Sequence, residues 1–240
     1  MVNLNKLLAS TILLVASTSV FAIPALQVDI DGGTYVGGSE ESVMTSADSF
    51  TTYVYGDVTS SKISGSDTYY LAVAIVSADG SSIAEGSLPT IGDFSIDGTT
   101  YSLASMTYGT PPVDDEYKEL ASHDIYDTYY IEIAFQFDTS TQYATQNVQD
   151  NPGGLTSGTG MYAQAFDIVR TGLADGYELH FDAYGLTDPC PAGAPNSCKQ
   201  KVDVFAPFSH DGGTYTVPES TSLLLLMFGL FGLLAVKRKA

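Results

Sequence analysis

Apolar and polar side chains alternate with a period of two from Thr128 to Asp138, and this pattern constrains the fold more than any other feature of the chain. One face carries Tyr129, Ile131, Ile133, Phe135 and Phe137, and the other carries Tyr130, Glu132, Ala134 and Gln136. Because successive side chains of a β-strand point to opposite faces, the pattern predicts a strand with its first set in a hydrophobic core. Between residues 23 and 216, no apolar stripe of helical period exceeds about two turns.

Other short runs of β-branched and aromatic residues predict further strands. They are Leu26–Ile30, Phe50–Tyr55, Tyr69–Val76, Phe94–Ile96, Thr100–Leu103, Met161–Val169, Tyr177–Tyr184 and Lys201–Ala206. The first alternates and is predicted to be half-buried, whereas Tyr69–Val76 is apolar on both faces at its centre, which places it inside a sandwich. About eight to ten strands without helices predict an all-β, antiparallel β-sandwich of jelly-roll-like form.

Glycine-containing turns separate these runs. Asp97-Gly98 between two strand patterns predicts a β-hairpin. The sequence Asp-Gly-Gly-Thr-Tyr occurs at residues 31–35 and again at residues 211–215, and Asp97–Tyr101 is a looser copy. The unequal spacing excludes a solenoid, so we interpret the copies as repeated use of one hairpin turn.

Residues 1–22 have the pattern of a secretory signal peptide. Lys6 precedes an apolar run from Leu7 to Val15, and Val20-Phe21-Ala22 offers small or permissive side chains where signal peptidase cuts. We therefore expect export, with cleavage after Ala22, and an ectodomain that comprises residues 23–216.

The C-terminal residues 217–240 combine Val217-Pro218-Glu219, an apolar run, and the basic end Lys237-Arg238-Lys239. Residues 220–236 would form a helix of about 25 Å, short for a hydrocarbon layer of about 30 Å. One interpretation is a simple transmembrane anchor with its basic end inside. The three-part order also resembles the PEP-CTERM sorting signal, although Ser220 replaces the usual second proline.

The resemblance to PEP-CTERM signals implies a location and two processing partners. Such proteins occur in Gram-negative bacteria that make exopolysaccharide, where an exosortase processes the tail. It implies anchoring in the inner membrane before processing, followed by release to the cell surface or extracellular matrix. Signal peptidase and an exosortase are therefore the expected partners.

The ectodomain is strongly acidic. With Lys6, Glu219 and the three basic residues of the tail set aside, 27 acidic and 5 basic residues remain, a net charge of −22. Such a charge repels nucleic acid and anionic lipid surfaces, which are excluded as expected partners. Solvated surface charge and binding of divalent cations are both consistent with the acidity.

Cys190 and Cys198 are the two cysteines of the chain, in a Pro- and Gly-rich stretch. In an oxidising compartment such a pair predicts a disulfide that closes a surface loop. Closing it would contribute about 2.5 kcal/mol by the chain-entropy model. Zinc binding by this pair is not expected, because the loop has no histidine and two thiolates are too few ligands.

Several stretches together resemble the choice-of-anchor N family. They are Leu26–Tyr35, His123–Tyr130, the Cys190 loop and Ala206–Asp211. Members are bacterial surface proteins in which a shared ectodomain is followed by different C-terminal anchors. The resemblance implies a class of protein and carries no catalytic residues over to this chain.

No catalytic constellation is visible. The histidines are His123, His180 and His210, and neither a Gly-x-Ser-x-Gly elbow nor a catalytic cysteine pattern accompanies them. His123 and His210 each precede an aspartate, so a shared metal site and ordinary loop hydrogen bonding are both open. Paired carboxylates of a glycosidase cannot be singled out among so many acidic residues.

Calcium is the one cofactor that the sequence suggests. Asp29 and Asp31 place two carboxylates beside Gly32-Gly33, and Ca²⁺ takes hard oxygen ligands. The alternative is a plain strand end and turn.

These observations lead us to expect a non-enzymatic, surface-sorted protein with a structural or adhesive role. The alternatives are a polysaccharide-binding module, for which the 16 tyrosines could supply stacking platforms, and a secreted hydrolase.

Overall fold

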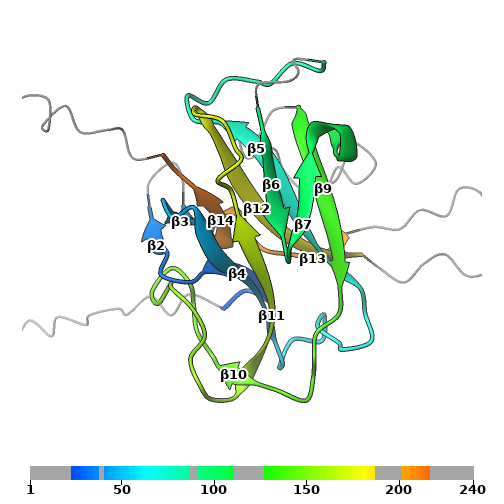
Figure 1. Cartoon of the computed structure of the whole chain (residues 1–240). Helices are drawn as coiled ribbons and strands as arrows, with labels where there is room; N and C mark the ends of the chain where they lie inside the picture. Colours follow the sequence, from blue (N-terminus) through cyan, green and yellow to red (C-terminus); the bar gives the residue numbers. More distant parts are fainter. Residues whose placement is uncertain (1–22, 38–40, 87–90, 111–126, 187–201, 217–240) are drawn as a thin grey trace, which may run out of the picture.

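The structure is a computed structural model of the chain, and it describes residues 23–37, 41–86, 91–110, 127–186 and 202–216 (Figure 1). The described residues form an all-β domain of two sheets. Helical turns among them are limited to two short 3-10 helices, η1 (Leu103–Ser105) and η3 (Phe208–His210). The all-β prediction is therefore confirmed for this part of the chain.

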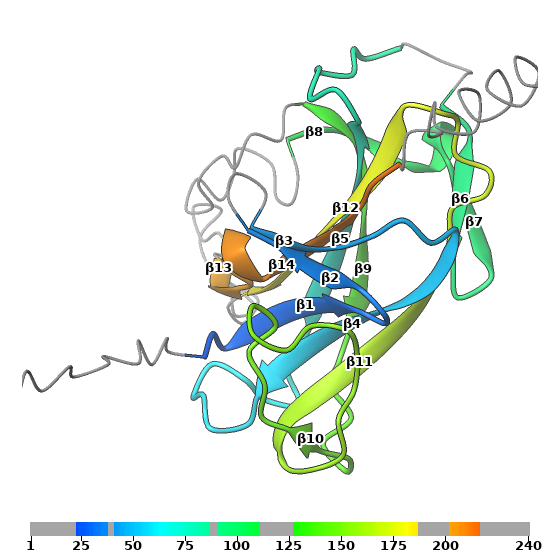
Figure 2. The ribbon, with the colours of Figure 1, turned by 90° about the vertical axis from the view of Figure 1, so that its left-hand side faces the viewer.

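Sheet A is six-stranded, and most of it comes from well-separated parts of the sequence. Its order is β1 (Leu26–Ile30), β4 (Ser49–Asp57), β11 (Gly160–Val169), β6 (Asp93–Ile96) and β7 (Thr99–Ser102), and β10 (Tyr143–Ala144) pairs with β11. Every pairing in this sheet is antiparallel. Figure 2 shows β1, β4 and β11 side by side.

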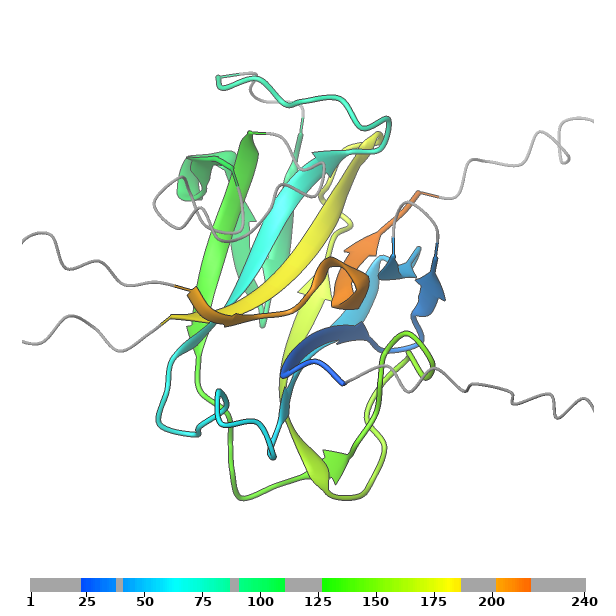
Figure 3. The ribbon, with the colours of Figure 1, turned by 180° about the vertical axis from the view of Figure 1, so that it is seen from behind.

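Sheet B is eight-stranded, with β12 and β5 near its centre (Figure 3). Its order is β2 (Thr34–Val36), β3 (Ser42–Thr45), β14 (Asp211–Thr214), β12 (Tyr177–Leu186), β5 (Tyr69–Ser77), β9 (Thr128–Phe135) and β8 (Thr107–Gly109), and β13 (Val202–Phe205) pairs with β12. The pair β14 and β3 is parallel, so the sheet is mixed and the purely antiparallel prediction is wrong at this position.

The two sheets share one hydrophobic core, to which strands of both contribute. Phe50 of β4 meets Phe181 of β12 edge to face, with ring centroids 5.9 Å apart. Phe166 of β11 meets Phe135 of β9 in the same way at 5.5 Å. Such aromatic contacts between the inner faces stabilise the packing of one sheet on the other.

The strands predicted from alternation and apolar runs are present. On β9, Tyr129, Ile131 and Phe135 face the core, as predicted, and Phe137 just beyond the strand is also buried. β5 lies between β12 and β9 and is buried over most of its length. The strands β2, β3, β8, β10 and β14 were not predicted, because they have two to four residues and no alternation long enough to detect.

The copies of the Asp-Gly turn motif have three different structures. Asp97 and Gly98 both have positive φ, 49° and 76°, and join β6 to β7 as a hairpin, which confirms that prediction. Residues 31–33 instead link β1 of sheet A to β2 of sheet B, and residues 211–214 form the buried strand β14. The prediction of one repeated hairpin turn is therefore wrong, because the surroundings of each copy set its conformation.

β1 also differs from its predicted half-buried state, since all five of its residues are buried. The β10–β11 loop, residues 145–159, passes beside this edge strand (Figure 2), and it forms hydrogen bonds with the side chains of Gln27 and Asp29. Polar side chains can be buried there because the loop supplies their hydrogen-bond partners.

Candidate functional site

Asp29, one of the two predicted calcium ligands, lies on β1 and is fully buried. Its carboxylate accepts five hydrogen bonds at distances between 2.8 and 3.3 Å. The donors are the backbone N–H groups of Ile30, Gly153 and Gly154, the hydroxyl of Tyr55 and the side-chain amide of Gln146. Asp29 thus fastens the β10–β11 loop to the edge strand.

These donors decide what the Asp29 carboxylate can bind. Burial raises its pKa, and the hydrogen bonds from Gly153, Gly154, Ile30 and Tyr55 oppose that shift. A carboxylate has about four lone-pair positions, so the five donors already occupy the positions at which it could accept further hydrogen bonds or bind a cation. Asp31 lies exposed in the following turn. The geometry favours a structural role for Asp29, and calcium binding by Asp29 and Asp31 stays a prediction.

Gln27, two residues before Asp29, holds the same loop. Its side-chain nitrogen donates to the carbonyl of Gln146, and its oxygen accepts from the N–H of Val148, both at 3.0 Å. The side-chain amide of Gln27 therefore satisfies a carbonyl and an N–H group of the loop backbone, and it holds the loop against β1 at the edge of sheet A.

His210, at the end of η3, is buried in contact with the same loop. Its Nε2 lies 2.9 Å from Oδ1 of Asn147, and its Nδ1 lies 2.8 Å from the hydroxyl of Ser209. Burial lowers the pKa of His210 to about 4, against a smaller opposing effect of Asp150. The imidazole is therefore neutral near pH 7 and joins η3 to the loop. The suggested partner His123 lies outside the described residues.

The third histidine, His180, lies on β12 and belongs to a different cluster. His180 and Asp182 occupy alternate positions, so they share the face of sheet B opposite the core residues Leu179 and Phe181. On the adjacent strand, His180 is opposite Gly213 and Phe181 is opposite Gly212. The same register continued by one position places Asp211 beside Asp182.

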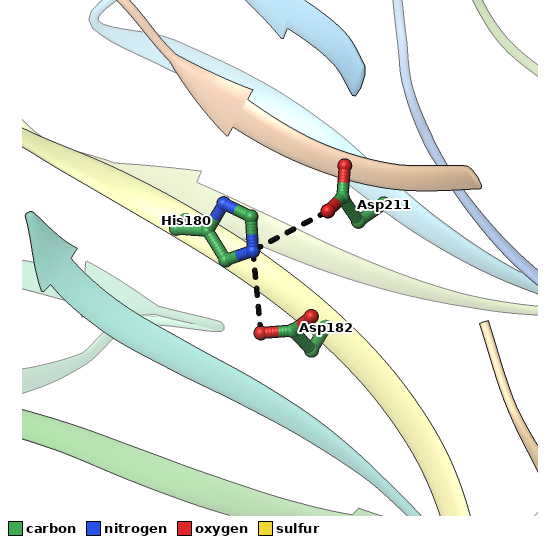
Figure 4. A group of neighbouring side chains, drawn as sticks. All are labelled: His180, Asp182 and Asp211. Atoms are coloured by element: carbon green, nitrogen blue, oxygen red, sulfur yellow. Dashed lines mark ion pairs between the residues drawn. The ribbon is translucent and has the colours of Figure 1, made fainter. Parts of the chain in front are cut away.

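The carboxylates of Asp182 and Asp211 both lie close to the Nε2 atom of His180 (Figure 4). This nitrogen is 3.3 Å from Oδ2 of Asp182 and 3.5 Å from Oδ2 of Asp211. The side chains of His180, Asp182 and Asp211 are 15%, 7% and 2% exposed. Two acidic groups and an imidazole are thus held together at the outer face of the sheet, almost out of contact with solvent.

Within the described part of the chain, this cluster is the group whose ligand atoms lie close enough to share one metal ion, all within 4.8 Å of one another. A protonated His180 would instead form ion pairs with both carboxylates. Sequence reasoning placed His180 on a strand and Asp211 in a turn, so it missed the cluster. The detectable signal was His180-x-Asp182 in a strand, but nothing in the sequence aligns Asp211 with this pair.

Several predicted site residues lie outside the described residues. They are Cys190, Cys198, Val217, Pro218, Glu219, Lys237, Arg238 and Lys239. The disulfide and the sorting tail therefore stay predictions. Within the ranges that the structure describes, no helix is both long and apolar enough to cross a membrane.

Comparison of the chain with protein-family models, with curated proteins and with solved structures gives no match.

Proposed function

We propose that this chain is an exported protein of the bacterial cell surface or exopolysaccharide matrix, with a structural or adhesive role and no enzymatic activity. The observation that carries the proposal is the pair of chain ends: a signal-peptide pattern at residues 1–22 and a PEP-CTERM-like tail at residues 217–240. The all-β domain between them and its net charge of −22 suit a protein that works outside the cell.

We further propose that the domain is a jelly-roll-like β-sandwich of the choice-of-anchor N kind. The shared core of the two sheets supports this proposal, and so does the chain path, which passes repeatedly from one sheet to the other. A signal helix would precede the domain, and a short transmembrane helix would follow it until the tail is processed.

The proposed pathway has defined steps and partners. Signal peptidase would cut after Ala22, and residues 220–236 would then hold the protein in the inner membrane of a Gram-negative bacterium. An exosortase would act at the tail, after which the domain would reach the surface or matrix. Nucleic acid is not a proposed partner, because the acidic domain repels it.

Two variants of the tail test the proposal in a Gram-negative host that has an exosortase. Deleting residues 217–240 should release the domain from the envelope fraction. The double substitution Pro218→Ala with Glu219→Ala keeps the apolar segment and the basic end, so it should block processing and leave a full-length, membrane-bound form. Mass spectrometry of the wild-type protein should show an N-terminus at Ile23 and a trimmed C-terminus.

The outcomes separate the two interpretations of the tail. If the double variant and the wild type have the same mass and the same fractionation, the tail is a simple anchor. If the deleted form stays bound to the envelope, the proposed sorting role of the tail is wrong.

Polysaccharide binding is the second candidate, and Tyr53 on β4 favours it. Its ring stacks on Tyr55 with centroids 6.1 Å apart and is partly exposed. Burial first, and then the charges of Asp31 and Asp167, raise the pKa of Tyr53. An aromatic face beside carboxylates can bind a sugar ring by stacking and by hydrogen bonds to its hydroxyl groups.

A glycan array tests this candidate. Binding should be lost in Tyr53→Ala and kept in Tyr101→Ala, which removes another partly exposed tyrosine of the same sheet. An array without binding by the wild-type protein would contradict it.

A secreted hydrolase is a weaker candidate. Asp182 and Asp211 form a close carboxylate pair, but their side chains are only 7% and 2% exposed. A substrate cannot reach carboxylates that are buried to this degree, so the pair suits a structural role.

A further inference from the structure

We propose that His180, Asp182 and Asp211 form a zinc site that joins β14 to β12 on the outer face of sheet B. The proposal concerns residues that lie apart from both Asp29 and the tail.

The charges of the two aspartates favour a cation at this position. Asp182 and Asp211 lie next to each other on adjacent antiparallel strands, with side chains that are 7% and 2% exposed. Like charges directly opposite each other destabilise a sheet, and burial increases the cost because water screens them less. A divalent cation between the two carboxylates would reverse this repulsion, and it would do so more completely than the single charge of an imidazolium.

The spacing of the ligand atoms around His180 fits a bound metal ion. Nε2 of His180 is 3.3 Å from the Asp182 oxygen and 3.5 Å from the Asp211 oxygen. Both distances exceed the roughly 2.7–2.9 Å of a charge-assisted hydrogen bond. Ligands about 2.0–2.2 Å from a tetrahedral zinc ion are about 3.4 Å apart, so each carboxylate oxygen already has this spacing from Nε2 of His180, and the three ligand atoms lie within 4.8 Å of one another.

The chemistry of the ligand atoms favours zinc. Ca²⁺ and Mg²⁺ bind oxygen ligands, whereas Zn²⁺ binds imidazole nitrogen and carboxylate oxygen together. Imidazole combined with carboxylates therefore favours zinc over the alkaline-earth ions. Three protein ligands leave at least one coordination position for water or another group.

The strands hold these ligands in place. His180 and Asp182 lie on β12, which pairs with β5 along nine positions from Tyr177 to Gly185. Asp211 lies on β14, which has four residues and lies between β12 and β3. A metal ion bridging the strands would therefore join a short strand to the centre of the sheet. Because β14 ends at Thr214, zinc would stabilise the described end of the domain, next to the start of the tail.

Calorimetry on the full chain tests the site directly. The protein, in detergent and without a polyhistidine tag, is stripped with EDTA, dialysed and titrated with ZnCl₂. We expect one zinc ion per chain. His180→Ala and Asp211→Asn should each weaken binding at least about tenfold, whereas Asp48→Asn, at a carboxylate whose side chain is 72% exposed, should bind as the wild type does.

Other zinc ligands in the chain require their own controls. His123→Ala and the double substitution Cys190→Ser with Cys198→Ser should keep the one-to-one binding. Co²⁺ provides a second readout, because a tetrahedral site gives visible absorption bands that should disappear in His180→Ala. Circular dichroism checks that each variant is folded. If His180→Ala is not folded, His180→Gln takes its place.

The proposal is overturned by any of three results. The first is the absence of saturable heat when 1 mM zinc is added to the folded wild-type protein, which would mean that His180 forms ion pairs without a metal. The second is binding that survives both His180→Ala and Asp211→Asn. The third is loss of binding in the His123 or cysteine variants alone, which would place the ion elsewhere. Loss confined to the His180 and Asp211 variants supports the site.

Discussion

At the scale of single residues, the most informative side chains are polar groups whose partners come from distant parts of the chain. Asp29 accepts donors from the β10–β11 loop, and His210 contacts the same loop from η3. A buried polar group stabilises a fold when its hydrogen bonds are complete and destabilises it when one partner is lost. These two residues therefore offer sensitive tests of how the edge of sheet A is held.

The first prediction concerns the donors around Asp29. Asp29→Asn keeps the shape of the side chain but turns an NH₂ group toward N–H and O–H donors. We expect it to lower the free energy of unfolding by about 2–4 kcal/mol, because buried donors are left without an acceptor.

Asp31→Asn is the matched control, since it makes the same chemical change at an exposed position two residues away. It should change the free energy of unfolding by less than about 0.5 kcal/mol. Urea denaturation measures both variants, and equal effects would contradict the structural role of Asp29.

The second prediction concerns pH. Burial lowers the pKa of His210 from 6.5 to about 4. Between these values the unfolded chain binds a proton that the folded chain does not, so stability is complete above pH 6.5 and is lost as pH falls toward 4. The pKa difference corresponds to a loss of at most about 3 kcal/mol.

Urea denaturation from pH 7 to pH 4, with EDTA present to remove metal ions, measures this effect. His210→Gln has no titrating group at that position, so its free energy of unfolding should fall less over the same range. Parallel pH profiles for the wild type and the variant would show that His210 does not carry the effect.

At the scale of elements, β14 depends on its glycines. Gly212 lies between β3 and β12, and a Cβ atom there would be 3.1 Å from Cγ1 of Val28 and 3.4 Å from Cδ1 of Ile30. β14 therefore packs closely on β1 of the other sheet, and a side chain at Gly212 would have to displace Val28 and Ile30. This contact also explains why a sequence typical of a turn forms a strand here.

The third prediction tests this close contact. Gly212→Val should overpack the space between β14 and β1 and lower the free energy of unfolding by about 1–3 kcal/mol. Gly37→Val is the control, because a Cβ atom there would have its nearest contact at 3.8 Å. Thermal and urea denaturation of the two variants should differ clearly, and similar curves would contradict the packing argument.

At the scale of the whole molecule, the net charge of −22 on residues 23–216 opposes compaction. Part of that charge is compensated locally. Lys62 forms an ion pair with Asp203, and Arg170 donates to the carbonyls of Ala47, Ser46 and Tyr215 while it lies 3.8 Å from Asp48. Five basic residues cannot neutralise 27 acidic ones, so salt should affect stability.

The fourth prediction separates screening from calcium binding. We expect Tm to rise with NaCl, because screening reduces repulsion between exposed carboxylates. CaCl₂ should raise Tm further at matched ionic strength if Asp29 and Asp31 bind the ion, and Asp31→Asn should remove that surplus. Identical melting curves in the two salts would exclude specific binding and leave solvated surface charge as the explanation.

The all-β class and the longer strands could be predicted from local sequence, because alternation of side chains is a local property of an extended chain. β9 and the Asp97-Gly98 hairpin could be predicted for this reason. The patterns of the two chain ends are likewise local, and they carry the proposed export and sorting. Burial of β1 could not be predicted, since its polar face is covered by a loop that lies far along the chain.

Contacts between distant residues depend on how the strands pair in the folded domain. One Asp-Gly sequence forms a hairpin, another links the sheets and a third becomes the buried strand β14, because their neighbours differ. The cluster of His180, Asp182 and Asp211 exists because β14 pairs with β12, and this pairing follows from how both sheets close on one core. Long-range strand pairing has no local signature, so the candidate metal site could be found only once the strands were in place.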